Sequence, residues 1–381
     1  MKEYFCILGG GGIRGMAYTG AIKALNKLNI KITGYAGSSI GAVVAGLLSV
    51  GYTEDEVKEQ FENINFDFFK DLNLKFGKDF ALSKGENFYK WSKNTIEKKV
   101  YGKIEDNEAY TFSKLKNELV ILAVDLTTSK IHEFSKTKTP NVEIAQAIRI
   151  SVGMPGLYAP VINGGECLVD GDLSKGSPLF LSSSTIKNLK EKILEFRLED
   201  NERKRKVSNT AEYLNAVYDA ISGFSSDFLI KRYGKFEKYD LIKLNMDEIS
   251  VVDFMASKEK KEEMVQKGYD TTLNYFENIY PEKEKEIKEI KTDIEYSLEK
   301  FKFLIDKKSY INARYELNEV FPRLISSKYK INEKFITKLL RLKDLFNVSL
   351  IEKDGFFGKK PVLINPDETL FLVDELKKEL I

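Results

Sequence analysis

The sequence Gly37-Ser38-Ser39-Ile40-Gly41 restricts the fold of this chain more than any other feature. An apolar segment, residues 30–36, precedes it, and a second one, residues 40–50, follows it. A G-x-S-x-G sequence between a strand and a helix places its serine on a sharp, strained turn, and a Cβ at either flanking position would collide with a neighbouring element. We therefore predict a strand, a nucleophile elbow and a helix, with the Ser39 hydroxyl exposed at the positive end of the helix dipole.

The glycine-rich sequence near the start of the chain, Gly9-Gly10-Gly11-Gly12-Ile13-Arg14-Gly15, permits two interpretations. Residues 4–8 before it predict a buried strand, and residues 14–28 predict a helix. A G-x-G-x-x-G spacing between a strand and a helix is typical of dinucleotide binding, which would make this a nucleotide-binding protein. That hypothesis needs an acidic residue at the end of the second strand, and residues 30–36 contain none.

The second interpretation is an oxyanion hole. The second predicted strand runs directly into the serine turn, so the loop and the turn would face each other. The loop amides would then stabilise the negative charge that develops when Ser39 attacks a carbonyl group, and one such donor typically lowers the barrier by ~2.7–4 kcal/mol. The candidate residues are Gly10, Gly11, Gly12, Ile13, Arg14 and Gly15.

The chain has one histidine, His132, which does not fit the role of general base. Serine, acid and histidine follow in that order in α/β-hydrolases, whereas His132 precedes the best candidate acid, Asp170. His132 lies in an alternating segment that favours a structural or surface role. Asp170 follows an apolar segment and precedes a glycine, so we predict that it accepts the serine proton directly, and burial would raise its pKa above the ordinary ~3.9. Asp172 either adds a second negative charge or faces solvent, and Ser38 is expected to point elsewhere.

These motifs, in this order, resemble those of the patatin-like phospholipases, a family of serine lipid acyl hydrolases. The resemblance covers residues 1–280 and implies a three-layer α/β/α fold. It also implies a dyad of Ser39 as nucleophile and Asp170 as proton acceptor, with no histidine, metal or other cofactor. This chain departs from the family at Asp172, where Gly or Ala is usual, and at Ser177, where Asn often precedes the proline. The matching sequences are Gly10–Gly15, Gly37–Gly41, Asp170-Gly171, 123–128 and 151–161.

Composition sets broad limits on partners and location. Lys and Arg number 60 against 58 Asp and Glu, so no overall field attracts nucleic acid, and we expect none as a partner. No apolar run reaches the ~18 residues of a membrane-spanning helix, and the first residues are too short for a secretion signal. We therefore expect a cytoplasmic enzyme, peripheral at the inner membrane surface, whose partner is a phospholipid or another acyl-ester lipid.

A change in composition near Pro281 predicts a domain boundary near residue 280. We expect an α/β acyl hydrolase domain with a mostly parallel sheet over residues 1–280, and a mainly helical region over residues 281–381. Apolar residues at helical spacing from Ile287 to Phe301 predict an amphipathic helix. Two further helices, 310–324 and 332–346, should precede a hairpin that turns at Asp354-Gly355. This region is a candidate for homo-oligomer or effector contact, and a third hypothesis makes the protein a non-catalytic scaffold acting through it.

Further elements complete the expected fold. A capping box at Thr53–Glu56 predicts a helix start. An aromatic segment, residues 65–101, is expected either to line an acyl-chain groove or to pack as core, and a basic run, residues 203–206, either to bind anionic headgroups or to be a solvated loop. The remaining predicted strands are residues 119–126, 130–135, 192–198 and 239–244, with one more that ends at Val169.

Overall fold

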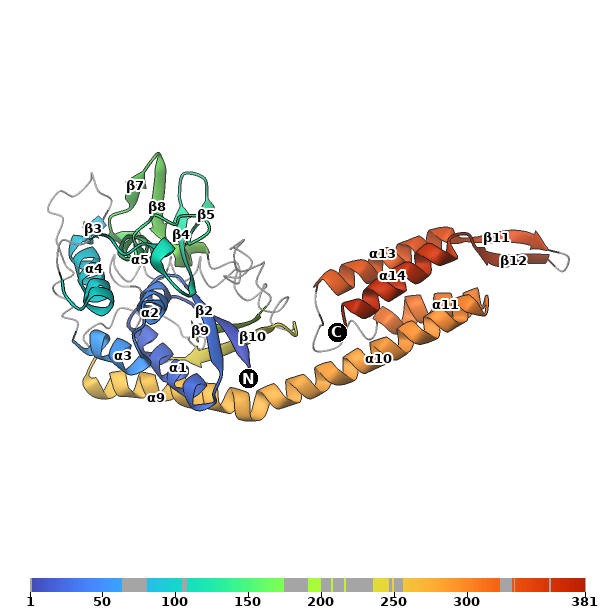
Figure 1. The fold of residues 1–381 in the computed structure, drawn as a ribbon, viewed down its shortest axis with the longest axis horizontal. Helices are drawn as coiled ribbons and strands as arrows, with labels where there is room; N and C mark the ends of the chain where they lie inside the picture. The colour runs from blue at the N-terminus through green and yellow to red at the C-terminus, as the bar shows by residue number, and fades with distance from the viewer. Residues whose placement is uncertain are drawn as a thin grey trace. The chain divides into compact units, whose positions relative to one another are not determined.

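The computed structural model describes most of the chain, and Figure 1 draws the remainder in grey. The described residues are 2–63, 81–104, 108–174, 191–199, 236–246, 256–322, 333–355 and 358–380, together with Val207, Ala216, Ile249 and Ile331. The aromatic cluster of residues 66–80, the basic run 203–206 and Ser177 lie outside them. The chain divides into two compact units. The first is Met1–Gly234 with Tyr239–Tyr275, and the second is Lys235–Lys238 with Phe276–Ile381. The domain boundary near residue 280 and a separate role for residues 281–381 stay predictions.

The first unit is built on an eight-stranded sheet of order β10-β9-β1-β2-β4-β8-β7, with β5 also paired to β4. The five strands from β10 to β4 are parallel to one another, and β5, β7 and β8 join in antiparallel fashion. The predicted mostly parallel sheet is confirmed. The strands are β1 Glu3–Leu8, β2 Lys31–Gly37, β4 Glu118–Asp125, β5 Lys130–Ser135, β7 Val161–Asn163, β8 Glu166–Asp170, β9 Lys192–Glu199 and β10 Tyr239–Asn245. Two short strands, β3 Ala81–Ser83 and β6 Gly156–Tyr158, form a separate pair.

Both faces of this sheet are covered. Successive side chains of a strand point to opposite faces, yet every residue from Tyr4 to Leu8 of β1 is at most 1% exposed. Such burial on both sides is typical of parallel sheets and explains why β1 is an unbroken apolar run instead of an alternating one. One face carries a core of Phe5, Ile7, Ala36, Val120 and Leu122.

The described helices of this unit are α1 Ala17–Lys27, α2 Ile40–Ser49, α3 Glu54–Glu62, α4 Glu86–Tyr101, α5 Ile144–Ser151 and α9 Lys258–Asn274 (Figure 1). The helix expected from residue 14 begins instead with a 3₁₀ turn, Gly12–Met16, and becomes α-helical at Ala17. Helices α1 and α9 approach at backbone distance. A Cβ on Gly20 would lie 1.8 Å from the Val265 carbonyl oxygen, and a Cβ on Gly268 would lie 1.9 Å from that of Ala17.

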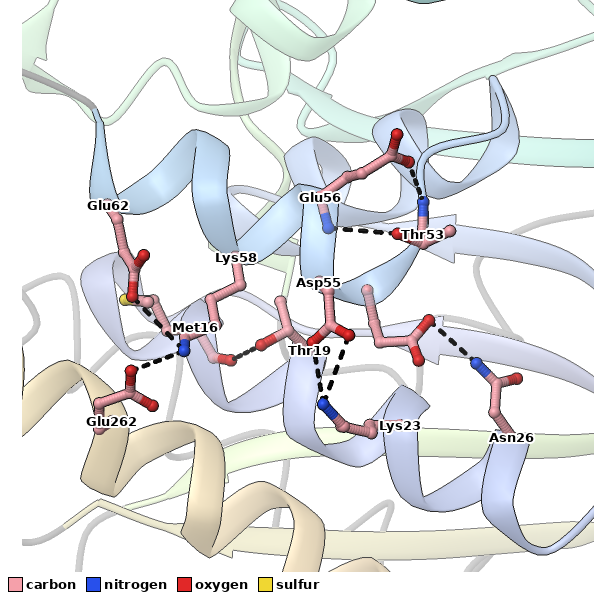
Figure 2. Close-up of polar contacts among 11 residues, drawn as sticks. Met16, Thr19, Lys23, Asn26, Thr53, Asp55, Glu56, Lys58, Glu62 and Glu262 are labelled. Carbon is pink, nitrogen blue, oxygen red and sulfur yellow. Dashed lines mark hydrogen bonds and ion pairs between the residues drawn. The ribbon is translucent and has the colours of Figure 1, made fainter.

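Polar contacts join α3 to α1 and α9 at the surface (Figure 2). The predicted capping box is confirmed, because Glu56 N donates to Thr53 Oγ1 and Thr53 N donates to Glu56 Oε2. Lys23 of α1 pairs with Asp55, and Lys58 pairs with Glu262 of α9 at 2.6 Å. The hydrogen bond from Lys58 to Glu262 raises the lysine pKa.

The second unit is mainly helical, as predicted. It contains α10 Tyr280–Asp306, α11 Tyr310–Tyr315, a π-helical turn Glu316–Val320, α13 Glu333–Ser349, a hairpin of β11 Leu350–Gly355 and β12 Gly358–Leu363, and α14 Pro366–Lys378. The apolar stripe of α10 is confirmed, since Ile290, Ile294, Leu298 and Phe301 lie in one core cluster with residues of α13 and α14.

The predicted hairpin is present, but its turn was wrongly placed. Gly355 pairs with Gly358, so Asp354 and Gly355 belong to a strand rather than a turn. The register that pairs Leu350 with Leu363 carries the ladder beyond the Asp-Gly signal. The last helix, α14, was not predicted, although Pro366 at its first turn and two acidic residues after it are ordinary start signals.

Candidate active site

The ends of β2 and β8 meet head-on along β4. Strand β2 pairs with β4 up to Gly37 opposite Ile121, and β8 pairs with it from the other direction, ending with Asp170 opposite Ala123. Because β5 occupies residues 120–125 of β4 on one edge, β2 and β8 must share the other edge. Two residues of strand span only about 6.6 Å. The residues that follow Gly37 and those around Asp170 are therefore brought together from 130 positions apart.

Ser39 occupies a strained backbone position at the start of α2. Its φ is 53° and its ψ is −130°, a conformation that typically costs about 1–3 kcal/mol and tends to occur at functional sites. The side chain is half-buried. The Ser39 amide donates to Ser151 Oγ at 3.1 Å, and Ser151 Oγ in turn donates to the Leu122 carbonyl oxygen at 2.6 Å. A fully buried serine at the end of α5 thus holds the elbow to β4.

The glycines of the elbow stand where side chains cannot. A Cβ on Gly41 would lie 2.0 Å from the Leu8 carbonyl oxygen, and a Cβ on Gly37 would lie 2.3 Å from that of Gly41. A Cβ on Gly15 would lie 2.5 Å from Cγ1 of Ile40. The elbow therefore packs directly against the end of β1 and against the glycine loop that follows it.

The loop residues fall into different environments. Gly11 and Gly12 have φ of 152° and 60° and are half-buried. Ile13 is fully buried, and Arg14 points its Nε to the Ile249 carbonyl oxygen at 2.6 Å. The buried Ile13 side chain and the hydrogen bond of Arg14 anchor the loop. Strand β2 ends without an acidic residue, so the dinucleotide hypothesis lacks its ribose contact here.

Asp170 and Asp172 are both buried, each 1% exposed. The Asp172 amide donates to Asp170 Oδ1 at 2.8 Å. The Asp172 side chain accepts two hydrogen bonds at Oδ1, from Ser38 Oγ at 2.5 Å and from Gly10 N at 3.1 Å. The alternative that Asp172 faces solvent is wrong, because this carboxylate lies between loop and elbow. Ser38 is fully buried and cannot present its hydroxyl to a substrate.

His132 lies apart from these groups. It belongs to β5, opposite Ala123, and that residue separates it from Asp170 on the other edge of β4. Two strand spacings, about 9.6 Å, separate the backbones of the two residues. The His132 Nδ1 lies instead 3.2 Å from Glu166 Oε1, and its ring packs beside Phe134.

The described part of the aromatic segment is a packed helix. Phe88 of α4 is 7% exposed and contacts Trp91 and Tyr158. Asp125 lies within residues 123–128, one of the segments that resemble the patatin-like family, and it closes the turn after β4. Hydrogen bonds from Thr128 and Thr127, with one from Cys167 N, hold the pKa of Asp125 well below its usual range. These contacts tie the start of β8 to the end of β4, three residues before the candidate base.

Comparisons with known proteins bear on the family and the fold. Residues 6–182 match the family model described as patatin-like phospholipase. An uncharacterized protein of Acanthamoeba polyphaga mimivirus is 27% identical over 276 residues, 68% of this chain and 89% of that protein. A probable lipid hydrolase of invertebrate iridescent virus 6 is 26% identical over 180 residues, 45% of this chain and 61% of that protein. The crystal structure of VipD from Legionella pneumophila has a TM-score of 0.54 at 15% identity, covering 99% of this chain and 90% of that one, which shows a shared fold.

Proposed function

Residues 6–182 are a patatin-like phospholipase domain, as the motifs predicted, and on this premise we propose that the protein is a lipid acyl hydrolase of the phospholipase A type. Ser39 is the nucleophile and Asp170 the proton acceptor. The observation that carries the proposal is the head-on meeting of β2 and β8, which joins the strained Ser39 turn to a buried carboxylate. The relative named as a probable lipid hydrolase supports the same class of reaction.

In the first half of the reaction, Ser39 Oγ attacks the acyl carbon of the ester and its proton passes to Asp170. The carbonyl oxygen becomes an oxyanion, and backbone amides of the glycine loop stabilise it together with the positive end of the α2 dipole. When the tetrahedral intermediate collapses, the bond to the alcohol breaks, and the alcohol leaves with the proton held by Asp170. The acyl group remains on Ser39.

In the second half, water replaces the alcohol. Asp170 takes a proton from water as its oxygen attacks the acyl carbon, and the same amides hold the second oxyanion. Collapse releases the fatty acid and returns the proton to Ser39 Oγ. Both halves use only side chains and amides of this chain.

The proposed substrate lies at a membrane surface. None of the helices in the part of the chain that the structure describes is long and apolar enough to cross a bilayer. We propose that the protein meets its lipid from the aqueous side, as a peripheral enzyme of the cytoplasmic leaflet.

A fluorophosphonate probe tests the nucleophile, and defined phospholipid vesicles test the substrate. We expect covalent labelling of the wild type on Ser39, no labelling of Ser39→Ala, and loss of turnover in Asp170→Asn. Mass spectrometry should find free fatty acid and lysophospholipid in equal amounts. His132→Ala is the control and should keep most activity. Inactivity of this folded control, or labelling of Ser39→Ala, would refute the dyad.

A further inference from the structure

Asp172 contacts all three motifs of the proposed active site, although the proposed reaction does not use it. It binds the glycine loop through Gly10 N and the elbow through Ser38 Oγ, and its own amide donates to Asp170 Oδ1. All three contacts are buried. One residue therefore links the loop, the nucleophile turn and the base.

The loop needs such a contact because four consecutive glycines, Gly9 to Gly12, precede its first side chain. Glycine populates more backbone conformations than any other residue, so this segment has little conformational preference of its own. Tyr18 Oη donates to the Gly9 carbonyl oxygen at 2.7 Å, and Asp172 accepts from the next amide, that of Gly10. A hydrogen bond to a carboxylate is roughly twice as strong as a neutral one, and removal from water keeps it formed.

The charge of Asp172 acts on the groups beneath the loop. Burial first, and then the negative charge of Asp172, raise the pKa of Tyr18. Burial disfavours the charged form of Arg197. The negative charges of Glu195 and, to a smaller extent, Asp172 act in the opposite direction and hold the pKa of that guanidinium above its usual value. The carboxylate is thus one member of a buried group of charges of both signs, which makes its burial less costly than that of an isolated ion.

We propose that Asp172 is a positioning residue that locks the glycine loop onto the elbow. It engages the Gly10 amide itself, which removes that amide from the candidate donors to the oxyanion and leaves those from Gly11 onward. This inference rests on the proposed function and narrows it, because the sequence alone had offered Gly10 equally with its neighbours.

The Gly10 position shows how closely the two residues fit. A Cβ on Gly10 would lie 1.9 Å from Asp172 Oδ2 and 2.3 Å from its Cγ, and the three nearest atoms all belong to Asp172. The backbone of Gly10 is not in the left-handed region, so alanine is excluded by this contact rather than by its own conformation. Gly10 and Asp172 are therefore a matched pair that can be tested without measuring activity.

The kinetic test compares Asp172→Ala with a matched buried aspartate. Asp240 is fully buried, accepts hydrogen bonds from Tyr4 and Tyr275, and lies on β10 outside the proposed site. On a soluble short-chain ester, Asp172→Ala should lower kcat about 10- to 100-fold with KM unchanged, since a misplacement of 1 Å can cost ~100-fold. Asp172→Asn keeps an acceptor oxygen and should lose less. Asp240→Ala should keep its kcat per folded molecule, and equal losses in the two alanine variants would overturn the proposal.

The second test is a thermal unfolding cycle of Gly10→Ala, Asp172→Gly and the double variant. Removing the carboxylate makes room for the new methyl group, so the double variant should be less destabilised than the sum of the two single changes. If the destabilisation of the double variant equals the sum of the two single changes, Gly10 and Asp172 do not meet as described, and the proposed role of Asp172 in positioning the loop is overturned. This cycle does not depend on turnover. If the wild type is inactive and is not labelled by the probe, the proposed function is refuted, whereas the contact between Gly10 and Asp172 is still tested by the cycle.

Discussion

The two units of this protein are held in shape by different kinds of contact. Around the site, backbone touches backbone, as at Gly41 against Leu8, and buried hydrogen bonds join residues more than 100 positions apart. In the second unit, a continuous cluster of apolar side chains joins α10, α13 and α14, with lysine–glutamate pairs at its surface. Geometry at the site therefore depends on a few positions, whereas the second unit depends on the total apolar area that it buries.

Gly41→Ala should break the site most severely. A Cβ there would lie 2.0 Å from the Leu8 carbonyl oxygen, and backbone cannot yield as a flexible side chain can. We expect ester hydrolysis to fall at least ~100-fold, the penalty typical of a 1 Å misplacement, together with a lower melting temperature. The matched control is Gly102→Ala, at a site with no atom within 4 Å of the new Cβ. It should lose some stability through its positive φ but keep kcat.

Phe346→Ala should show the opposite pattern. The ring is fully buried and packs on Phe301, and truncating such a side chain costs about 3–5 kcal/mol. We expect that loss in the unfolding transition of the second unit, seen by calorimetry, with ester hydrolysis per folded molecule unchanged. A fall in kcat as large as that of Gly41→Ala would show that the site depends on the second unit and would abolish the contrast.

Ser151→Ala should produce an intermediate effect. The Ser39 amide would lose its acceptor while the strained turn remains, so we expect kcat to fall about tenfold, equivalent to ~1.4 kcal/mol. Ser92→Ala removes another buried hydroxyl, which donates to Phe88 O within α4. Steady-state kinetics should separate the two variants, and identical kcat values would mean that Ser151 does not position the nucleophile.

Acid titration should give the smallest difference between the units. Hydrogen bonds from Thr128 and Thr127 lower the pKa of Asp125, and Lys338 and Lys334 lower that of Glu379. A carboxyl with a depressed folded-state pKa stabilises the fold above its unfolded pKa, ~3.9 for Asp and ~4.3 for Glu, and this contribution is lost as pH falls through the folded value. The stability advantage of the wild type over Asp125→Asn should therefore shrink below pH ~4.

Salt distinguishes the two carboxylates. High salt screens exposed charges, so it should weaken the acid-dependent stability that Glu379 contributes and leave that of Asp125 in place. Denaturation at two salt concentrations, with Glu379→Gln beside Asp125→Asn, measures this. An equal response to salt would contradict the distinction between hydrogen-bonded and ion-paired carboxylates.

The sequence was sufficient to predict most strands of the sheet and the long amphipathic helix α10, and the roles that it suggests for Ser39 and Asp170 stay predictions. Unbroken apolar runs predicted β1 and β4, and the period of α10 appeared in its isoleucines, because these signals are local. The role of Asp172 was not predictable, since its partners Gly10 and Ser38 are 162 and 134 positions away. Ser151 lies within residues 151–161, another segment that resembles the family. The role of its hydroxyl can be recognised only in the fold, where it contacts both Ser39 and Leu122. The predicted position of the hairpin turn was wrong because Asp354 and Gly355 pair with the opposite strand, although Asp-Gly is a local turn signal.

The shared edge of β4 also bears on how the enzyme is made. Neither strand end forms the proposed site alone, so on the proposed function a growing chain cannot hydrolyse an ester until β8 has emerged and paired opposite Ala123. Pairings between segments so distant are slow to form, because loop closure must come before the contacts that reward it. On the proposed function, hydrolysis therefore requires β8 in addition to the three parallel strands that precede it in the chain, β1, β2 and β4.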